Sequence, residues 1–153
     1  MRLVDITSEN REVIIREIRE NDYLSVAKIW RDVLDIPVTD DDLIHTYESM
    51  KEDKRYTTYV AESDGTVVGL VTMVTALAIG HPDGYTKING LGVLPEYRNM
   101  GIGRMLLEQA EKVAVQNGTR YLGLASGLMR EDAHRFYEHM GYMKTSYWFR
   151  KRV

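Results

Sequence analysis

The chain has no cysteine among its 153 residues. That absence excludes a disulfide scaffold, a thiol nucleophile and every metal site that depends on cysteine ligands. It is compatible with a reducing compartment. The opening stretch MRLVDITSEN lacks the apolar core of a signal peptide, and no apolar run approaches the ~20 residues that span a membrane. We therefore expect a soluble, cytoplasmic protein with no membrane partner.

A strong charge of one sign is also absent. The 20 basic and 23 acidic residues leave a net charge of −3, so nucleic acid is not an expected partner. Low-complexity tracts, internal repeats and linkers rich in Pro, Gly or Ser are missing as well. The length fits one domain, and we expect a single domain over residues 1–153, in which residues 1–12 form either an additional short strand or a loose arm.

The chain does contain a clear succession of strand-like segments. Runs of β-branched or alternating residues predict strands in VIIREI from Val13 and from Tyr85 to Leu94. Two more strands are predicted in TTYVAESDGTVVGLVTMV, on either side of an Asp64-Gly65 turn. The last two are RYLGLAS, whose composition indicates a buried strand, and the closing YMKTSYWFRKRV. GHPDG, around His81, is typical of a loop.

Helical spacing of apolar residues predicts four helices between these strands. They are NDYLSVAKIWRDVL, a short helix after the N-cap residue Thr39, Gly101 to Asn117 with Gly118 as C-terminal cap, and EDAHRFYEHM. The order β-α-α-β-β-β-α-β-α-β, in which strands dominate, predicts an α+β fold: a mixed, mostly antiparallel sheet with helices packed on its faces.

A glycine-rich turn opens the third helix in RNMGIGRMLLEQ, residues 98–109. Unpaired N–H groups at a helix start can hold an anion, and Arg98 and Arg104 add positive charge. A Walker A loop is excluded because no Gly-x-x-x-x-Gly-Lys-Ser/Thr run exists, and a dinucleotide fingerprint fails at Leu106, where it needs a third glycine. The remaining pattern is Arg-x-x-Gly-x-Gly, and a bare Gly-x-Gly pair is as often only a tight packing turn.

Two longer segments resemble one family. VLPEYRNMGIGRMLLEQAEKVAVQNG is similar to motif A of the GNAT N-acetyltransferase superfamily, and DAHRFYEHMGY is similar to its motif B. One short strand separates them, as in that family, and the order of elements matches from Val13 onward. The resemblance implies the acyl-CoA N-acyltransferase (GNAT) fold with about six to seven strands and helices on both faces. It also implies acetyl-CoA as cosubstrate, no metal, and an amine as acceptor.

In that family the glycine turn binds the pyrophosphate of coenzyme A, and the preceding strand pairs with the pantetheine arm in a gap beside the next strand. The resemblance also implies a backbone N–H near Val93 that faces the thioester oxygen. Arg130 either reaches a coenzyme phosphate or faces water. The implied coenzyme-binding residues are Leu91, Gly92, Val93, Arg98, Asn99, Met100, Gly101, Ile102, Gly103, Arg104, Ser126, Arg130 and Ala133.

Tyr137 matches the family tyrosine that protonates the departing thiolate, although an aromatic residue at this spacing also suits a buried helix face. The family's strand glutamate, which usually acts as a base through water, is replaced by Asn89, and an amide cannot accept the proton. The base stays open between solvent and the side chains of His81, Glu62 and His134. Because the chain has no cysteine, a Cys-based ping-pong route is excluded, and direct attack in a ternary complex is expected.

The acceptor amine is not identified by the sequence. In the family it is shaped by segments that correspond to TDDDLIHTYESMKED, AIGHPDG and KTSYWF, and Tyr85, His45 and Trp148 are candidates to line its pocket. The acidic run Asp40 to Asp42 either attracts a cationic amine or caps its helix. The alternative to an enzyme is a catalytically degenerate module that binds or senses acyl-CoA. A homodimer through the closing strands would follow the family's habit.

Overall fold

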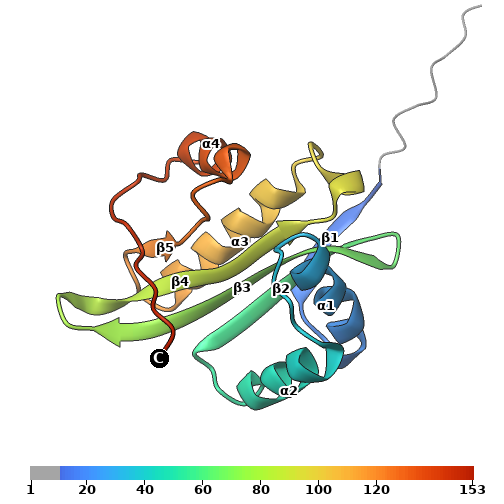
Figure 1. The fold of residues 1–153 in the computed structure, drawn as a ribbon, viewed down its shortest axis with the longest axis horizontal. Helices are drawn as coiled ribbons and strands as arrows, with labels where there is room; N and C mark the ends of the chain where they lie inside the picture. Colours follow the sequence, from blue (N-terminus) through green and yellow to red (C-terminus); the bar gives the residue numbers. More distant parts are fainter. Residues whose placement is uncertain (1–10) are drawn as a thin grey trace, which may run out of the picture.

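A five-stranded sheet forms the centre of the computed structural model, which describes residues 11–153 (Figure 1). Its strands lie side by side in chain order: β1 (Val13–Glu17), β2 (Tyr56–Ser63), β3 (Thr66–Ala78), β4 (His81–Val93) and β5 (Leu122–Leu124). Strands β1 to β4 are antiparallel to their neighbours, and β5 runs parallel to β4. The predicted α+β class with a mixed, mostly antiparallel sheet is confirmed.

Helices cover both faces of this sheet. The helices α1 (Tyr23–Asp32) and α2 (Asp40–Met50) share a core with Leu70 of β3. The helices α3 (Ile102–Gln116) and α4 (Glu131–His139) pack into a second core with Val71, the next residue of β3. Because successive side chains of a strand point to opposite faces, the two cores lie on opposite sides of the sheet. Short 3₁₀ turns, η1 (Glu20–Asp22) and η2 (Pro95–Tyr97), precede α1 and α3.

The predicted turn and cap residues behave as their chemistry indicates. Thr39 caps α2, because its Oγ1 accepts a hydrogen bond from the Asp42 N–H at 3.1 Å. Asp64 and Gly65 both have positive φ, 49° and 79°, as a type I′ hairpin turn requires. Gly118 follows α3 with φ 74°, the left-handed conformation of a helix C-terminal cap.

The expectations about the strands need correction. Fewer strands than the expected number of about six to seven are present in residues 11–153, because the closing segment YMKTSYWFRKRV forms none. This segment passes across β5 and β4 instead of running along a strand edge (Figure 1), and its side chains after Tyr142 are exposed. The β3–β4 hairpin is longer than expected, since Ala78 pairs with His81 and β4 begins there rather than after a loop. RYLGLAS contributes only a three-residue strand, whose side chains are half-buried or exposed rather than buried. The predicted strand or arm at 1–12 lies outside the described residues except for its last two.

Strand β4 contains one extra residue. Thr72 of β3 pairs with Gly90, whereas the next residue, Met73, pairs with Ile88, so Asn89 has no partner in this ladder. Such a β-bulge shifts the alternation of side chains along the strand. Ile88 and Leu91, three residues apart, accordingly both pack into the α3 core, which a regular strand forbids.

Two glycines beyond the bulge bring α1 close to β4. A Cβ atom at Gly90 would lie 2.4 Å from the Trp30 ring, and one at Gly92 would lie 3.2 Å from Ile29. The alternation in NGLGV therefore has a packing cause: the glycines face α1 and the larger residues face α3. The Trp30 ring rests directly on the main chain of β4, where any side chain at Gly90 would collide with it.

Candidate active site

Strands β4 and β5 separate after a short parallel ladder. They pair only between residues 86–88 and Leu122–Leu124, after which β5 ends while β4 continues to Val93. Beyond Ile88, β4 is bound to β3 alone, so its other edge keeps main-chain N–H and C=O groups without a strand partner. We call this stretch, between β4 residues 89–93 and the end of β5, the β4–β5 opening.

Two N–H groups of β4 point into this opening. The N–H of Leu94 donates to Val68 O at 2.8 Å, on the β3 side. Because the N–H groups of an antiparallel strand alternate between its two edges, those of Val93 and Leu91 point away from β3. They are main-chain donors in fixed positions, available to a ligand in the β4–β5 opening.

The turn before α3 presents further free N–H groups. Gly101 has φ 80° and Asn99 has φ 60°, both left-handed values, which glycine adopts without steric cost. The first hydrogen bond of α3 runs from the Met105 N–H to Gly101 O at 3.0 Å, and within residues 11–153 no backbone acceptor takes the N–H groups of residues 99–104. With the positive end of the helix dipole, this turn has the properties of an anion site.

The two arginines that flank this turn differ. Arg104 pairs with Glu108 one helical turn further on, with 3.0 Å between Nε and Oε1, and both side chains are exposed. Arg98 is exposed and makes no ion pair within residues 11–153. Main-chain donors therefore dominate the site, and Arg98 is the flanking cation that is free to act on an anion there.

Tyr137 lies on the inner side of α4, next to the start of α3. Its ring centroid is 5.4 Å from that of Phe136 and 6.0 Å from that of Tyr142, and Phe136 would be 3.5 Å from a Cβ at Gly103. Burial raises the pKa of Tyr137, and the positive charge of Arg130 lowers it less, so the pKa stays above its ordinary value. The phenol is therefore fully protonated at neutral pH.

Arg130 connects two walls of the site. Its Nη2 donates to the carbonyl oxygen of Val33, at the end of α1, over 3.3 Å. The side chain thus bridges from the start of α4 to the end of α1. The sequence suggests for Arg130 either a coenzyme phosphate or solvent, and not this contact. Its pairing with a phosphate stays a prediction.

The base candidates are spread over the molecule. Glu62 is held in an ion pair with Arg16 at 2.6 Å on β2, two strands from β4. His81 begins β4, about 26 Å before the bulge at the usual rise per residue. The Nε2 of His134 lies 2.8 Å from Gly127 O, and because a carbonyl only accepts, this nitrogen carries a hydrogen. Solvent is the remaining candidate, since the bulge residue is exposed.

The residues predicted to shape the acceptor site lie in different parts of the fold. Asp40 pairs with Arg31 at 2.6 Å, and the other acidic residues of this run occupy the first turn of α2, which is the capping role. His45 is exposed on α2. Trp148 comes to the sheet, where its ring centroid lies 4.1 Å from Lys87 Nζ.

The residues predicted to bind coenzyme A lie in adjacent parts of the structure. Leu91, Gly92 and Val93 line the β4–β5 opening on one side, and the chain from Arg98 to Arg104 follows directly through η2. Ser126 and Ala133 are half-buried beyond β5 and on α4. Sequence reasoning missed Trp30 and Lys87. The spacing of the glycines in NGLGV was the signal for Trp30, and nothing local indicates Lys87.

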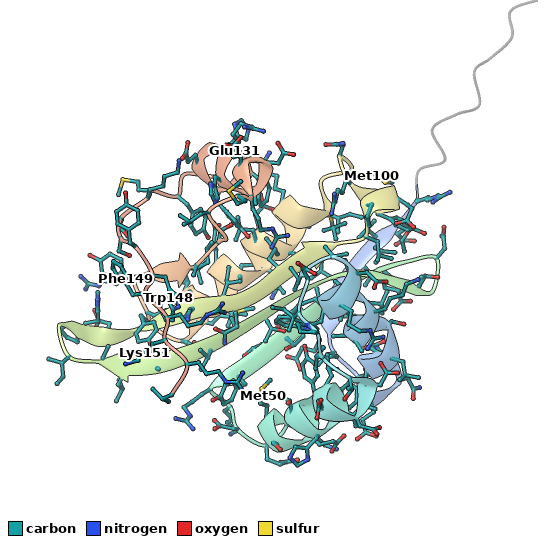
Figure 2. All side chains as sticks on the ribbon, in the orientation of Figure 1. Met50, Met100, Glu131, Trp148, Phe149 and Lys151 are labelled. Atoms are coloured by element: carbon teal, nitrogen blue, oxygen red, sulfur yellow. The ribbon has the colours of Figure 1, made fainter. Side chains whose placement is uncertain are left out.

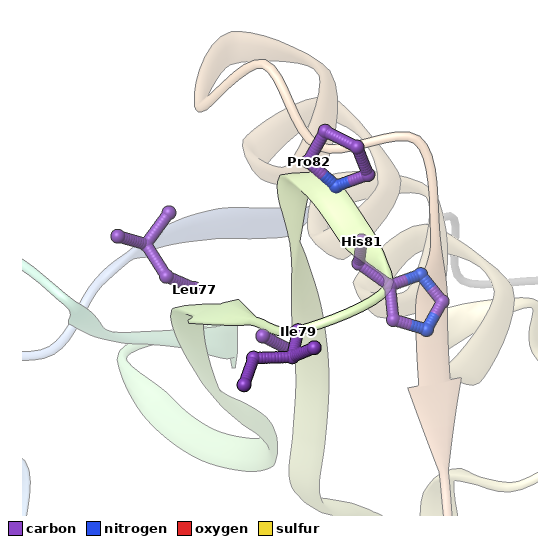
Figure 3. Close-up of a pocket in the computed structure, with 5 residues that line it drawn as sticks. Leu77, Ile79, His81 and Pro82 are labelled. Carbon is purple, nitrogen blue, oxygen red and sulfur yellow. The ribbon is translucent and has the colours of Figure 1, made fainter.

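A shallow hollow lies elsewhere, at the tip of the β3–β4 hairpin. Figure 3 shows its lining residues Leu77, Ala78, Ile79, His81 and Pro82. The tip is at the far end of β4 from the turn before α3 (Figure 1), so the hollow is separate from the candidate site. In residues 11–153 no group of three or more metal-ligating side chains is found, and no helix there is long and apolar enough to cross a membrane.

Residues 23–142 match the Acetyltransferase (GNAT) family. The chain belongs to that family. Among curated relatives, an aminoalkylphosphonate N-acetyltransferase of Salmonella typhimurium is 36% identical over 94 residues, 61% of each chain. An uncharacterised N-acetyltransferase of Bacillus subtilis is 49% identical over 57 residues, 37% of this chain and 40% of that one. The matched parts of this GNAT chain thus span less than two thirds of these relatives.

Solved structures confirm the GNAT fold. A transcriptional regulator from Bacillus halodurans superimposes with a TM-score of 0.82 at 24% identity, covering 93% of this chain and 100% of the other. An aminoglycoside N-acetyltransferase, AAC(6')-Iy, solved in complex with CoA, superimposes with a TM-score of 0.83 at 16% identity, covering 97% and 100%. At these identities the likeness shows the fold alone.

Proposed function

We propose that this GNAT protein is an acetyl-CoA-dependent N-acetyltransferase that acts on a primary amine by direct transfer in a ternary complex. The observation that carries the proposal is the set of free main-chain donors along one path. Val93 and Leu91 direct N–H groups into the β4–β5 opening, and the N–H groups of residues 99–104 follow at the turn before α3.

The residues present fit a coenzyme A molecule. Its pyrophosphate needs fixed donors and room for close approach, and nothing lies within 4 Å of a Cβ position at Gly101. Its pantetheine amides need a free strand edge, which β4 has beside the β4–β5 opening. One of the solved GNAT structures with this fold contains CoA, which supports the assignment.

Bound acetyl-CoA supplies an acetyl thioester. The acceptor amine forms the new C–N bond to the carbonyl carbon, and the C–S bond breaks. The Val93 N–H holds the carbonyl oxygen as negative charge grows on it, a contribution of ~3 kcal/mol in such sites. Tyr137 donates its proton to the departing sulfur, which leaves as the free thiol. The surplus proton on nitrogen passes to water beside Asn89, and Tyr137 regains a proton from solvent. No metal takes part.

The experiment is a thiol-release assay with acetyl-CoA and a panel of amines. Because the chain has no cysteine, a thiol reagent reports coenzyme A alone, with no background from the protein. We expect amine-dependent thiol release with matching N-acetyl product. Tight coenzyme binding without release across the whole panel would contradict the proposal and favour the alternative, an acyl-CoA-binding module.

We also propose that two copies associate through the C-terminal segment. Trp148 turns toward the sheet, whereas its neighbours Tyr147 and Phe149 are 81% and 91% exposed. Figure 2 shows Phe149 and Trp148 near the hairpin end of the sheet, where Leu77 and Ile79 are also exposed. Burial of these apolar side chains favours association. Light scattering should give a dimer mass, and the double change Tyr147→Ser with Phe149→Ser should give a monomer.

A further inference from the structure

We propose that the acceptor is a small primary amine that carries an anionic group, and that Lys87 binds this group. The inference rests on the proposed acetyltransferase function. It concerns the sheet face that carries α1 and α2, at the part of β4 before the bulge. This face is opposite to the side on which Tyr137 and α3 lie.

The direction of approach follows from where the leaving group is held. Tyr137 packs into the core on the α3 side of the sheet, so the sulfur that it protonates departs on that side. The amine nitrogen then reaches the carbonyl carbon from the other side, because the side chains of α3 and α4 form a packed core on the side where Tyr137 lies. The acceptor therefore occupies the sheet face of α1 and α2.

Lys87 lies on that face. Ile88 packs toward α3, so its neighbour Lys87 points the opposite way. Residue 87 is two positions before the bulge at Asn89, about 7 Å along the strand. An ammonium on a flexible four-carbon chain at this place reaches a charged group only a few bonds from the reacting amine.

There is open space beside this lysine. Its register partner on β5 is Gly123, which has no side chain, and no atom lies within 4 Å of a Cβ position there. Helix α1 approaches β4 at Gly90 and Gly92, through Trp30 and Ile29. The face between β5 and α1 therefore presents Lys87 beside a strand position that has no side chain.

Lys87 is also a cation without a counter-charge. No carboxylate of residues 11–153 pairs with it, whereas the two other half-buried Lys or Arg side chains in this range do have one: Arg16 pairs with Asp22, and Arg31 with Asp40. Its Nζ is held over the Trp148 ring at 4.1 Å from the centroid. A cation–π contact orients an ammonium while its remaining hydrogens stay available, so Lys87 is ready to accept an anion from a ligand.

The charges around Lys87 also favour an anionic ligand. The C-terminal segment that carries Trp148 continues into Arg150, Lys151 and Arg152, and Figure 2 shows Lys151 over the same part of the sheet. The acidic residues of α2 are engaged within their own part of the fold: Asp40 to Asp42 occupy its first turn, where Asp40 pairs with Arg31, and Glu48 pairs with Lys51. This environment favours an anionic substituent on the acceptor and disfavours a second ammonium.

The test uses four acceptors of matched length: β-alanine, 2-aminoethylphosphonate, 2-aminoethanol and 1,2-diaminoethane. Thiol release is measured for the wild-type protein, Lys87→Met, Lys87→Arg and the control Lys112→Met, which removes an exposed lysine of α3. The ratio of kcat/KM between variant and wild type cancels the different basicities of the amines. The carboxylate and phosphonate arms distinguish the two sources of negative charge.

We expect Lys87→Met to lower kcat/KM at least tenfold for one or both anionic acceptors, through KM, and much less for the amino alcohol. Lys87→Arg should restore most of the loss, and Lys112→Met should cause none. An equal loss on all four acceptors with unchanged coenzyme affinity, or a wild-type preference for the diamine, would overturn the inference and leave the acetyltransferase function standing. Absence of thiol release with every amine would overturn that function instead, and the inference with it.

Discussion

The two sides of β4 differ in the kind of chemical group that they offer. Toward the β4–β5 opening and α3, the donors are main-chain N–H groups, at Leu91, Val93 and the turn before α3. Toward α1 and α2, the groups are side chains, Lys87 with Trp148 above it, brought from β4 and the C-terminal segment. A main-chain site tolerates many side chains provided that the backbone keeps its path. A side-chain site depends on one or two residues and varies easily.

The largest effect is expected from a charge placed among the main-chain donors. Gly101→Asp adds a carboxylate where nothing lies within 4 Å, and Gly101→Asn adds a neutral group of the same shape. Both residues tolerate positive φ better than most. We expect the Kd for coenzyme A to rise about 100-fold for Asp, because like charges repel, and less than about tenfold for Asn, measured by calorimetry. Equal losses would mean that shape, not charge, governs the site.

Tyr137→Phe should follow in size. Loss of the proton donor should lower kcat about 100-fold and leave coenzyme affinity nearly unchanged, because the ring still fills its place. The control is Tyr142→Phe, which loses the hydrogen bond of the neighbouring phenol to Glu111 at 3.2 Å and should cost about 1 kcal/mol of stability with kcat intact. A Tyr137→Phe protein with normal turnover would remove the general acid from the mechanism.

The raised pKa of Tyr137 also makes a prediction about pH. A phenol whose pKa lies above its ordinary value keeps its proton to higher pH. The wild-type kcat should therefore show no loss of an acidic group below about pH 10. A decline in kcat at lower pH that disappears in Tyr137→Phe would contradict the raised pKa.

A smaller effect tests the contact between α1 and β4. Gly90→Ala would place a Cβ 2.4 Å from the Trp30 ring, an overpacking that should cost about 2 kcal/mol of unfolding free energy. Trp30→Phe gives up a 3.4 Å hydrogen bond to Tyr47 but makes room. In urea titrations, the unfolding free energy lost by the double variant should be about 1 kcal/mol smaller than the sum of the losses of the two single variants. Strict additivity would show that the ring does not press on β4.

The smallest effect is expected at the bulge residue itself. Asn89→Ala should change kcat/KM for any good acceptor by less than about threefold, since an amide is not the base and the side chain is exposed. Steady-state kinetics at two pH values suffice. A loss as large as that expected for Tyr137→Phe would give the amide a direct role.

The difference between the two sides also explains what the sequence could predict. The glycine turn, the Thr39 cap and the Asp64-Gly65 hairpin each depend on residues within a few positions of one another, and the structure confirms their conformations. The family was expected from the resemblance of two segments to motifs A and B, and the fold from that resemblance together with the order of the elements. That these residues bind coenzyme A stays a prediction.

Contacts between distant segments gave no such signal. The pairing of Lys87 with Trp148 joins residues 61 positions apart, and the Arg130 bond to Val33 spans 97. The closing segment was predicted as a strand because its side chains alternate. Alternation shows only that a segment suits a sheet, and here no strand edge receives it.

The extra residue in β4 reverses, halfway along the strand, which edge the N–H groups of odd-numbered and even-numbered residues point to. Before it, the Thr86 N–H donates toward β5 to Tyr121 O at 3.0 Å. Seven residues later the Val93 N–H points toward the same edge, although an odd interval in a regular strand would turn it to the other. The presence of a residue at position 89, and not the nature of its side chain, sets the direction of the N–H groups that follow. Substitution there preserves that direction, whereas deletion would turn every donor of the β4–β5 opening back toward β3.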